Sequence, residues 1–380
     1  MNIKIDKKDD IILKILHYFI TEEDYKPVII NGLENEIWLE NMENDLQLIR
    51  INTNYIHNNE QLKTDIYKAK TIMKSIKKST LSLNINLLNL LLDTGDSVSF
   101  TDIDTKGIET VKVEKISDFK RNKVVGVFFP KVKEAILNEK MNPVEFFKLT
   151  EDMNEKTIKN EKKLARIFSQ KKPVITYLLI VINIMIYLYG LLYQKEDVLF
   201  DYFANYYPAI RAGEYYRLFT AMFLHANAAH IIFNMYALYV AGPQVERYYG
   251  KAKFLFVYIL GGLMGSVFSC VFMDSNTYGI GASGAIFALF GSIAYFTYYY
   301  RATLQGLLRS QIVPVIMVNL FLGILMPGVD VMAHIGGLIG GVLVSMWIGI
   351  GDKSRRADQI NGAIVFISMF LFMLYLVLTK

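Results

Sequence analysis

The run that decides the fold is residues 174–193, which read VITYLLIVINIMIYLYGLLY and contain no charged side chain. A helix needs roughly 20 apolar residues to cross the hydrocarbon core of a bilayer, so this run is long enough to span a membrane. Counting it, seven candidate spans lie near residues 174–193, 230–249, 254–273, 281–300, 312–326, 331–350 and 362–379. The fifth run is short, which favours a helix with little tilt or a locally thin bilayer. The sequence therefore predicts a polytopic α-helical membrane domain over residues 173–380.

Residues 1–172 have a different composition, rich in Lys, Asp, Glu and Asn, although 53% of the whole 380-residue chain is apolar. Apolar periodicity predicts helices near Asp10–Ile20, Glu60–Lys78 and Pro130–Leu137, and strands near Pro27–Ile30, Glu36–Glu40, Leu46–Ile51, Leu81–Leu92 and Glu109–Glu114. We therefore expect a small soluble α+β domain over residues 1–150. The charged residues 151–172 are expected to form a helical or flexible connector to the membrane.

The distribution of Lys and Arg predicts the orientation of the spans. Basic residues cluster in alternate connections: Lys162, Lys163, Arg166, Lys171 and Lys172; Arg247, Lys251 and Lys253; Arg301 and Arg309; Lys353, Arg355 and Arg356. Connections 274–280 and 327–330 carry none, and the long loop 194–229 carries three. Because basic loops stay on the cytoplasmic side, we expect a multi-pass cell-membrane protein with a cytoplasmic N-terminus and an extracellular C-terminus.

Composition also excludes several classes of function. The formal net charge of +5 is small for this length, so nucleic-acid binding is not expected. The single cysteine, Cys270, excludes an intramolecular disulfide and a Cys-rich metal site. The charged start MNIKIDKKDD predicts no cleavable signal peptide.

The first candidate catalytic residue is Ser283, in the stretch YGIGASGAIFAL over residues 278–289. A short connection leads directly into a helix there, so Ser283 is predicted at or near a helix N-terminus, where backbone donors can hold an oxyanion. Gly281 and Gly284 permit a tight turn and the close approach of another chain. Taken alone, such a small-residue run is more typical of packing between membrane helices.

A serine needs a base to become a nucleophile, and His334 is the best candidate because ionisable groups at membrane depth are costly and mostly functional. It lies in AHIGGLIGG over residues 333–341, where Gly336/Gly340 and Gly337/Gly341 form two small-xxx-small ridges. A close helix crossing would bring its ring within reach of a serine. Asp330 lies almost a full turn earlier, outside the expected core, so a Ser/His dyad is expected rather than a triad.

His230 and Asn234 form a second constellation, one turn apart on one helix face. Both side chains can donate hydrogen bonds to an oxyanion. Two alternatives stay open: the pair is polar glue between helices, or His225 and His230 are metal ligands. The metal alternative lacks an acid or third ligand at the usual spacing, so no metal or other cofactor is predicted.

These residues together resemble the rhomboid family, over about residues 170–380. The resemblance lies in Gly281-Ala-Ser-Gly284, in Ala333-His-Ile-Gly-Gly337, and in His230 with Asn234. Residues 213–225, GEYYRLFTAMFLH, resemble the first-loop signature of the family, with Tyr216 where Trp usually precedes Arg. Gly242, Glu246 and Gly250 match a structural Gly-xxx-Glu-xxx-Gly pattern.

The resemblance implies a six-helix core with one additional C-terminal transmembrane helix, and an intramembrane serine endopeptidase that cleaves transmembrane protein substrates. It implies an acyl-enzyme on Ser283, with His334 as base and then acid. Asn234, His230 and the Ser283 N–H would form the oxyanion hole. Phe287, where the family commonly has Tyr, would pack on the His334 ring. Because a hydrogen-bonded helix shields its carbonyls, substrates are expected to unwind locally at small residues and helix breakers.

Two other classes of protein are alternatives to the protease. The alternative is a non-catalytic rhomboid-like protein that binds transmembrane segments in membrane-protein quality control, but such a protein is expected to lack the nucleophile or the base. A transporter or channel would show repeats or aligned intramembrane charges.

The N-terminal domain with a seventh span resembles the YqgP type of Gram-positive bacterial rhomboid, and it could bind a cytosolic or membrane-protease partner. Its acids are more typical of solvated surface than of a divalent-ion site: Glu34, Glu36, Glu40, Glu43 and Asp45.

Overall fold

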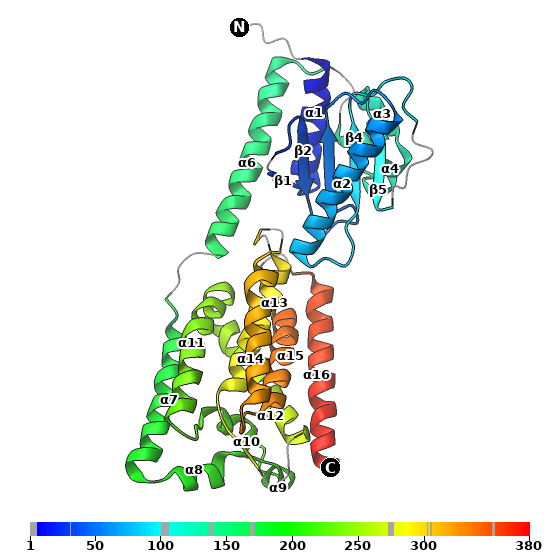
Figure 1. Cartoon of the computed structure of the whole chain (residues 1–380). Coiled ribbons are helices and arrows are strands. Elements are labelled where there is room, and N and C mark those ends of the chain that lie inside the picture. The colour runs from blue at the N-terminus through cyan, green and yellow to red at the C-terminus, as the bar shows by residue number, and fades with distance from the viewer. Residues whose placement is uncertain are drawn as a thin grey trace. The chain divides into compact units, whose positions relative to one another are not determined.

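A computed structural model describes residues 6–30, 32–99, 106–136, 140–167, 172–272, 277–301, 303–304, 306–351 and 354–380. The chain divides into two compact units, Met1–Arg166 and Ile167–Lys380, which we call the N-terminal and C-terminal units (Figure 1). Lys171, Lys353 and residues 274–276 of the predicted outer connection 274–280 lie outside the described residues.

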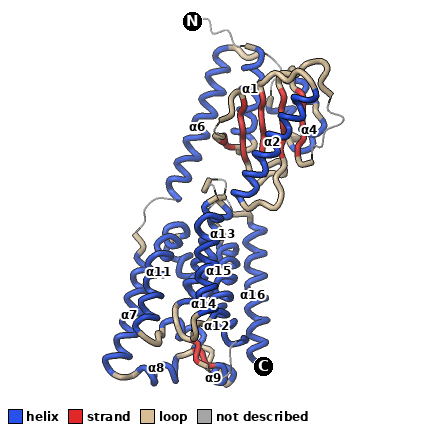
Figure 2. Tube along the Cα trace, in the orientation of Figure 1, coloured by secondary structure: helices blue, strands red, loops and turns tan. Residues whose placement is uncertain are grey.

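The N-terminal unit is built on a five-stranded mixed sheet (Figure 2). Its strands follow chain order: β1 (Lys26–Val28), β2 (Glu36–Glu40), β3 (Leu48–Asn52), β4 (Leu87–Leu91) and β5 (Ile108–Lys112). The first three strands pair antiparallel, and β3, β4 and β5 pair parallel. A parallel pair needs a crossover, and α2 (Asn59–Thr80) supplies it between β3 and β4.

Helices cover both faces of this sheet, because alternate residues of a strand point to opposite sides. On one face α1 (Lys7–His17) and the short helices α3 (Ile116–Arg121), α4 (Lys123–Phe128) and α5 (Val132–Ala135) pack on side chains such as Ile49 and Leu88. On the other face α2 packs on Leu48, Leu87 and their neighbours. The predicted small α+β region is confirmed, and α3 and α4 are additions that the sequence reading missed.

The face beneath α2 also buries a charged group. The Arg50 guanidinium, which is fully buried, donates to Asp65 at 2.6 Å and to Glu36 at 2.7 Å. Burial by itself raises the pKa of the Glu36 carboxyl, but the hydrogen bond and charge of Arg50 outweigh burial and lower that pKa below its usual 4.5. Glu36 therefore contributes stability that is present above pH 4.5 and is lost as the pH falls through its lowered folded value.

We expect Arg50→Met to destabilise the N-terminal unit by about 3–5 kcal/mol, because two largely buried carboxylates lose their partner. Hydrogen exchange of the β3 amides in the full-length protein measures this loss. Lys8→Met is the control, because it removes an exposed partner of Asp93 and should change exchange little. Unchanged protection of β3 in the Arg50 variant would contradict the structural role of this ion pair.

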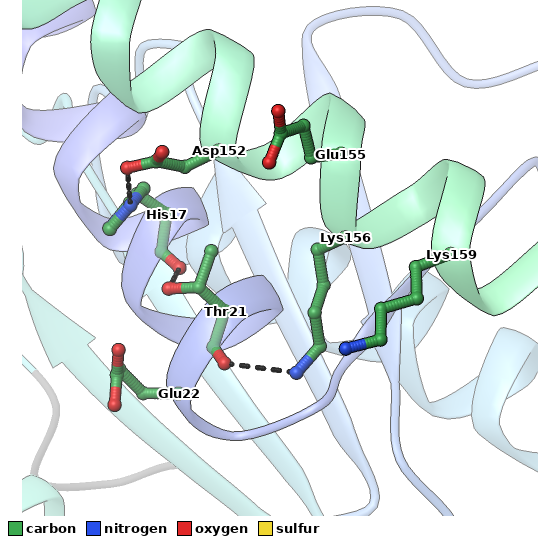
Figure 3. A pocket seen from close by; sticks show the side chains of 7 residues that line it. All are labelled: His17, Thr21, Glu22, Asp152, Glu155, Lys156 and Lys159. Carbon is green, nitrogen blue, oxygen red and sulfur yellow. Dashed lines mark hydrogen bonds and ion pairs between the residues drawn. The ribbon is translucent and has the colours of Figure 1, made fainter.

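The charged segment after residue 150 belongs to a long helix, α6 (Pro143–Ile167), that packs against α1 and the π-helical turn Tyr18–Glu22. Figure 3 shows the polar contacts, in which His17 meets Asp152 at 3.4 Å and Lys156 donates to the Thr21 carbonyl at 3.3 Å. They line a cleft of about 400 Å³. The connector, predicted to be helical or flexible, is therefore helical and belongs to the N-terminal unit, which ends at about residue 166. Residues 168–171 lie outside the described residues.

The C-terminal unit contains seven apolar helices at the seven predicted positions. They are α7 (Val174–Tyr193), α11 (Ala228–Tyr249), α12 (Lys251–Phe272), α13 (Ser283–Tyr299), α14 (Val313–Leu325), α15 (Val331–Ile348) and α16 (Arg356–Thr379). Among the described residues four are long and apolar enough to cross a membrane, α7, α12, α15 and α16. The count rises to five if Arg217–Phe223 and α11, bent by 94°, form one broken span. With 17 and 13 residues, α13 and α14 are shorter than the length expected from the sequence.

Shorter elements complete this unit. They are α8 (Glu196–Phe203), β6 (Asn205–Tyr206), α9 (Tyr207–Arg211), α10 (Arg217–Thr220), a 3₁₀ turn (Ala221–Phe223), β7 (Tyr278–Gly279) and a π-helical turn (Leu308–Ile312). Arg217 orders the long loop by donating to Glu214 at 2.7 Å and to the Asp201 carbonyl at 2.7 Å. Glu246 accepts from the amides of Ile175 and Thr176 at the start of α7, which agrees with the structural role predicted for it.

Glycine allows α15 to lie against α12 and α13 at once. A methyl group added to Gly337 would lie 2.0 Å from the Gly284 carbonyl oxygen on α13, and one added to Gly340 would lie 2.8 Å from Met264 Cβ on α12. The two predicted ridges are confirmed, and they face different helices. The sequence reading missed the matching glycines of α12, Gly261 and Gly265, whose four-residue spacing is the same signal.

Candidate active site

Ser283 is the first residue of α13 and is half-buried. Two interactions fix the segment that precedes Ser283. Strand β7 pairs antiparallel with β6, and the Gly281 amide donates to the Ala221 carbonyl at 2.9 Å. Gly281 has φ +125°, a conformation that residues with a side chain rarely adopt. The serine therefore sits where the first N–H groups of α13 have no carbonyl partner within the helix.

His334 lies in the first turns of α15 and is buried. Its ring stacks on Phe287, with 4.2 Å between ring centroids and 12° between planes. Phe287 stands one turn after Ser283 on α13, and the Ala333 carbonyl would lie 3.4 Å from a methyl group added to Gly284. The residues flanking both side chains are thus in contact, which brings Ser283 and His334 to the same point of the α13–α15 crossing.

The edge of the His334 ring that carries Nδ1 faces apolar surroundings. Its Nδ1 has no hydrogen-bond partner among the described residues, and a methyl group added to Gly323 on α14 would lie 3.5 Å from it. Asp330, the nearest acid in sequence, instead caps α15 by accepting from the Ala333 amide at 2.9 Å. Gly323 is a neighbour of the site that the sequence reading missed, because a lone glycine in an apolar helix carries no specific signal.

His230 and Asn234 of α11 both face Gly281. A methyl group added there would lie 2.7 Å from His230 Nε2 and 3.7 Å from Asn234 Nδ2. The Ala226 amide donates to His230 Nδ1 at 3.4 Å, so this hydrogen bond assigns the proton of the neutral ring to Nε2. His230 therefore presents a donor toward the segment that carries Ser283.

The two histidines considered as metal ligands, His225 and His230, lie side by side. His225 is buried with its ring centroid 5.1 Å from that of His230, and both its ring nitrogens lack hydrogen-bond partners among the described residues. In the described part of the chain there is no group of three or more His, Cys, Asp or Glu side chains that could hold a metal ion. Of the acids at 34–45, Glu36 is engaged with Arg50, as described above.

This fold and site define a multi-pass membrane protein with a serine, two histidines and an amide around one helix crossing. The model of the rhomboid domain matches residues 212–350. Similar proteins include the rhomboid protease GluP of Bacillus subtilis, 28% identical over 92% of this chain and 71% of its own length. The rhomboid protease AarA of Providencia stuartii is 30% identical over 60% of this chain and 90% of its own length. The chain belongs to the rhomboid family.

The similarity to GluP corrects one expectation. An alignment over 92% of the chain is longer than the C-terminal unit, so the resemblance to this relative continues into the N-terminal unit. The motifs that carry the predicted resemblance over about residues 170–380 all lie in the C-terminal unit, so they gave no signal for the first 150 residues. The assignment to the YqgP type stays a prediction.

Proposed function

We propose that this protein is an intramembrane serine endopeptidase that cleaves transmembrane segments of other proteins by a Ser283–His334 dyad. The observation that carries the proposal is the stacking of His334 on Phe287, one turn after Ser283, at a crossing made close by Gly284 and Gly337. The protease names of GluP and AarA support the same class of reaction.

In the proposed reaction His334 Nε2 takes the proton of the Ser283 hydroxyl, and the serine oxygen attacks the scissile carbonyl. The protonated ring then gives its proton to the leaving amine, which leaves an acyl-enzyme for water to hydrolyse. Nε2 is the nitrogen available to Ser283 because Nδ1 faces Gly323. Since Asp330 is engaged as a helix cap, ring orientation rests on the stacking with Phe287, as expected for a dyad.

Three donors are proposed to stabilise the oxyanion: the Asn234 amide, His230 Nε2 and the Ser283 backbone N–H. The first two are supported by their positions near Gly281, and the third by its place at the start of α13. Phe287, Gly281 and Gly284 are proposed to support the site without reacting.

The substrate is proposed to be a membrane helix that unwinds locally, since its carbonyls are otherwise hydrogen-bonded. By the distribution of basic loops, the protein is proposed to lie in the cell membrane with a cytoplasmic N-terminus and an extracellular C-terminus. Recruitment of a cytosolic or membrane-protease partner by the N-terminal unit stays a prediction.

Reconstitution tests the proposal against the binding-only alternative. Full-length protein in liposomes is expected to convert a single-span substrate with a Gly- and Pro-containing segment into two products, whose ends mass spectrometry assigns to the membrane segment. Retention of intact substrate without products would favour the quality-control binder instead.

Asn234→Ala is expected to slow this cleavage by about a hundredfold, or about 3 kcal/mol, because one oxyanion donor is lost. Asn319→Ala is the matched control: both amides donate to the carbonyl four residues earlier, but Asn319 is exposed on α14. The kcat of the control should equal that of the unmodified protein. Equal kcat values in all three proteins would show that Asn234 does not stabilise the oxyanion.

A further inference from the structure

The outer side of α2 concentrates positive charge in one line. Residues three or four apart lie on the same face of a helix, and this spacing relates the members of what we call the α2 stripe: Lys63, Tyr67, Lys70, Lys74, Lys77, Lys78 and Leu81. Lys70 is half-buried and the others are exposed. Like charges at this spacing destabilise a helix, so the stripe is not explained by the stability of α2 itself.

Acidic side chains do not balance the stripe along the helix. Besides Glu60 in its first turn, α2 contains one acid, Asp65, and that carboxylate points inward to Arg50 at 2.6 Å. The cleft between α1 and α6 differs, since Lys156 and Lys159 share it with Glu22, Asp152 and Glu155 (Figure 3). Within α2 itself lysines therefore outnumber acids, whereas in that cleft lysines and acids lie together.

Apolar side chains are exposed at the C-terminal end of the stripe. Leu81 is 40% and Leu83 is 86% exposed. Leu81 also ends α2 with φ +51°, in the left-handed region where helices usually place Gly. The apolar face of α2 is buried against the sheet, so the exposed leucines that follow the lysines are the apolar groups available to a lipid interface.

A short segment joins the N-terminal unit to the first membrane helix. Only six residues, 168–173, separate the end of α6 from the start of the membrane helix α7. At most about 3.5 Å per residue, such a segment reaches about 20 Å. Tethering of this length raises the effective concentration of lipid at the N-terminal unit, so even weak contacts can be populated.

We propose that the α2 stripe binds anionic lipid headgroups of the bilayer that holds the C-terminal unit, with Leu81 and Leu83 entering the interface. Lysine ammonium groups complement lipid phosphates, and the leucines complement the acyl boundary. The proposal goes beyond the protease activity and does not rest on it, since no member of the stripe belongs to the Ser283 site.

The test places a fluorophore at the end of the stripe in full-length protein. Cys270 is buried, so a Leu83→Cys variant can be labelled selectively with bimane. The labelled protein is reconstituted into phosphatidylcholine vesicles, with or without phosphatidylglycerol, that contain a nitroxide-labelled lipid as quencher. We expect strong quenching only in the anionic vesicles, and its loss at high salt, because salt screens the headgroup attraction.

Two charge-matched variants complete the experiment. Lys63→Gln with Lys74→Gln and Lys77→Gln should abolish the anionic-lipid-dependent quenching, whereas Lys123→Gln with Lys131→Gln and Lys133→Gln should leave it unchanged. Gln and Lys have similar helix propensities, so α2 is expected to remain folded, and circular dichroism checks this. Equal quenching in neutral and anionic vesicles, or equal loss in both triple variants, would overturn the proposal.

Discussion

Ser283→Ala should abolish cleavage of a helical membrane substrate, with a fall in rate of about a millionfold, as when a catalytic serine is removed from other serine proteases. His334→Ala should lower the rate to a similar floor, because the serine loses the base that takes its proton. The double variant should be no slower than either single one, since both residues serve one step. Cleavage of a reconstituted single-span substrate, followed on gels over days, measures all three rates.

Ser292→Ala is the control for these variants. Ser292 lies on the same helix as Ser283, is fully buried, and its Oγ has no hydrogen-bond partner among the described residues. Its loss should leave the cleavage rate unchanged. Undiminished turnover in Ser283→Ala would exclude the proposed nucleophile, and similar loss in Ser292→Ala would point to a packing effect.

Gly337→Val should separate α13 from α15 and impair both folding and catalysis. A Cβ atom at this position would lie 2.0 Å from the Gly284 carbonyl oxygen, so backbone has to move. Overpacking of this kind typically costs about 1–3 kcal/mol. A displacement of about 1 Å between reacting groups alone reduces the rate about a hundredfold.

Thermal unfolding in detergent and the cleavage rate measure the two effects of Gly337→Val separately. Gly126→Ala is the control, because a methyl group added there meets nothing within 4 Å. A Gly337→Val protein with unchanged melting temperature and rate would contradict the close α13–α15 crossing.

Sequence patterns located the membrane helices because hydropathy is a local property. The prediction for α7, residues 174–193, matches its bounds, since an uncharged apolar run begins and ends there. The start of α16 was missed by six residues because its first turn contains Arg356 and Asp358, which are helical but not apolar. The two-residue strands β6 and β7 were missed because their pairing depends on residues far apart in the chain.

The sequence indicates a candidate site residue where a side chain is costly to place inside a membrane and is therefore mostly functional there. A histidine beside glycine ridges, as at His334, is such a case. The stacking on Phe287 came from the family resemblance and agrees with the structure. By contrast, the proximity of Gly323 to His334, and the burial of Arg50 between Glu36 and Asp65, arise from tertiary packing that local periodicity does not encode.

Covalent labelling of Ser283 tests the central claim most directly. Full-length protein in liposomes is incubated with a serine-directed phosphonate, and the modified residue is located by peptide mass spectrometry. The dyad predicts a single adduct on the Ser283 oxygen, absent in Ser283→Ala and strongly slowed in His334→Ala. An adduct on another residue, or labelling of Ser283 at the same rate without His334, would contradict the dyad.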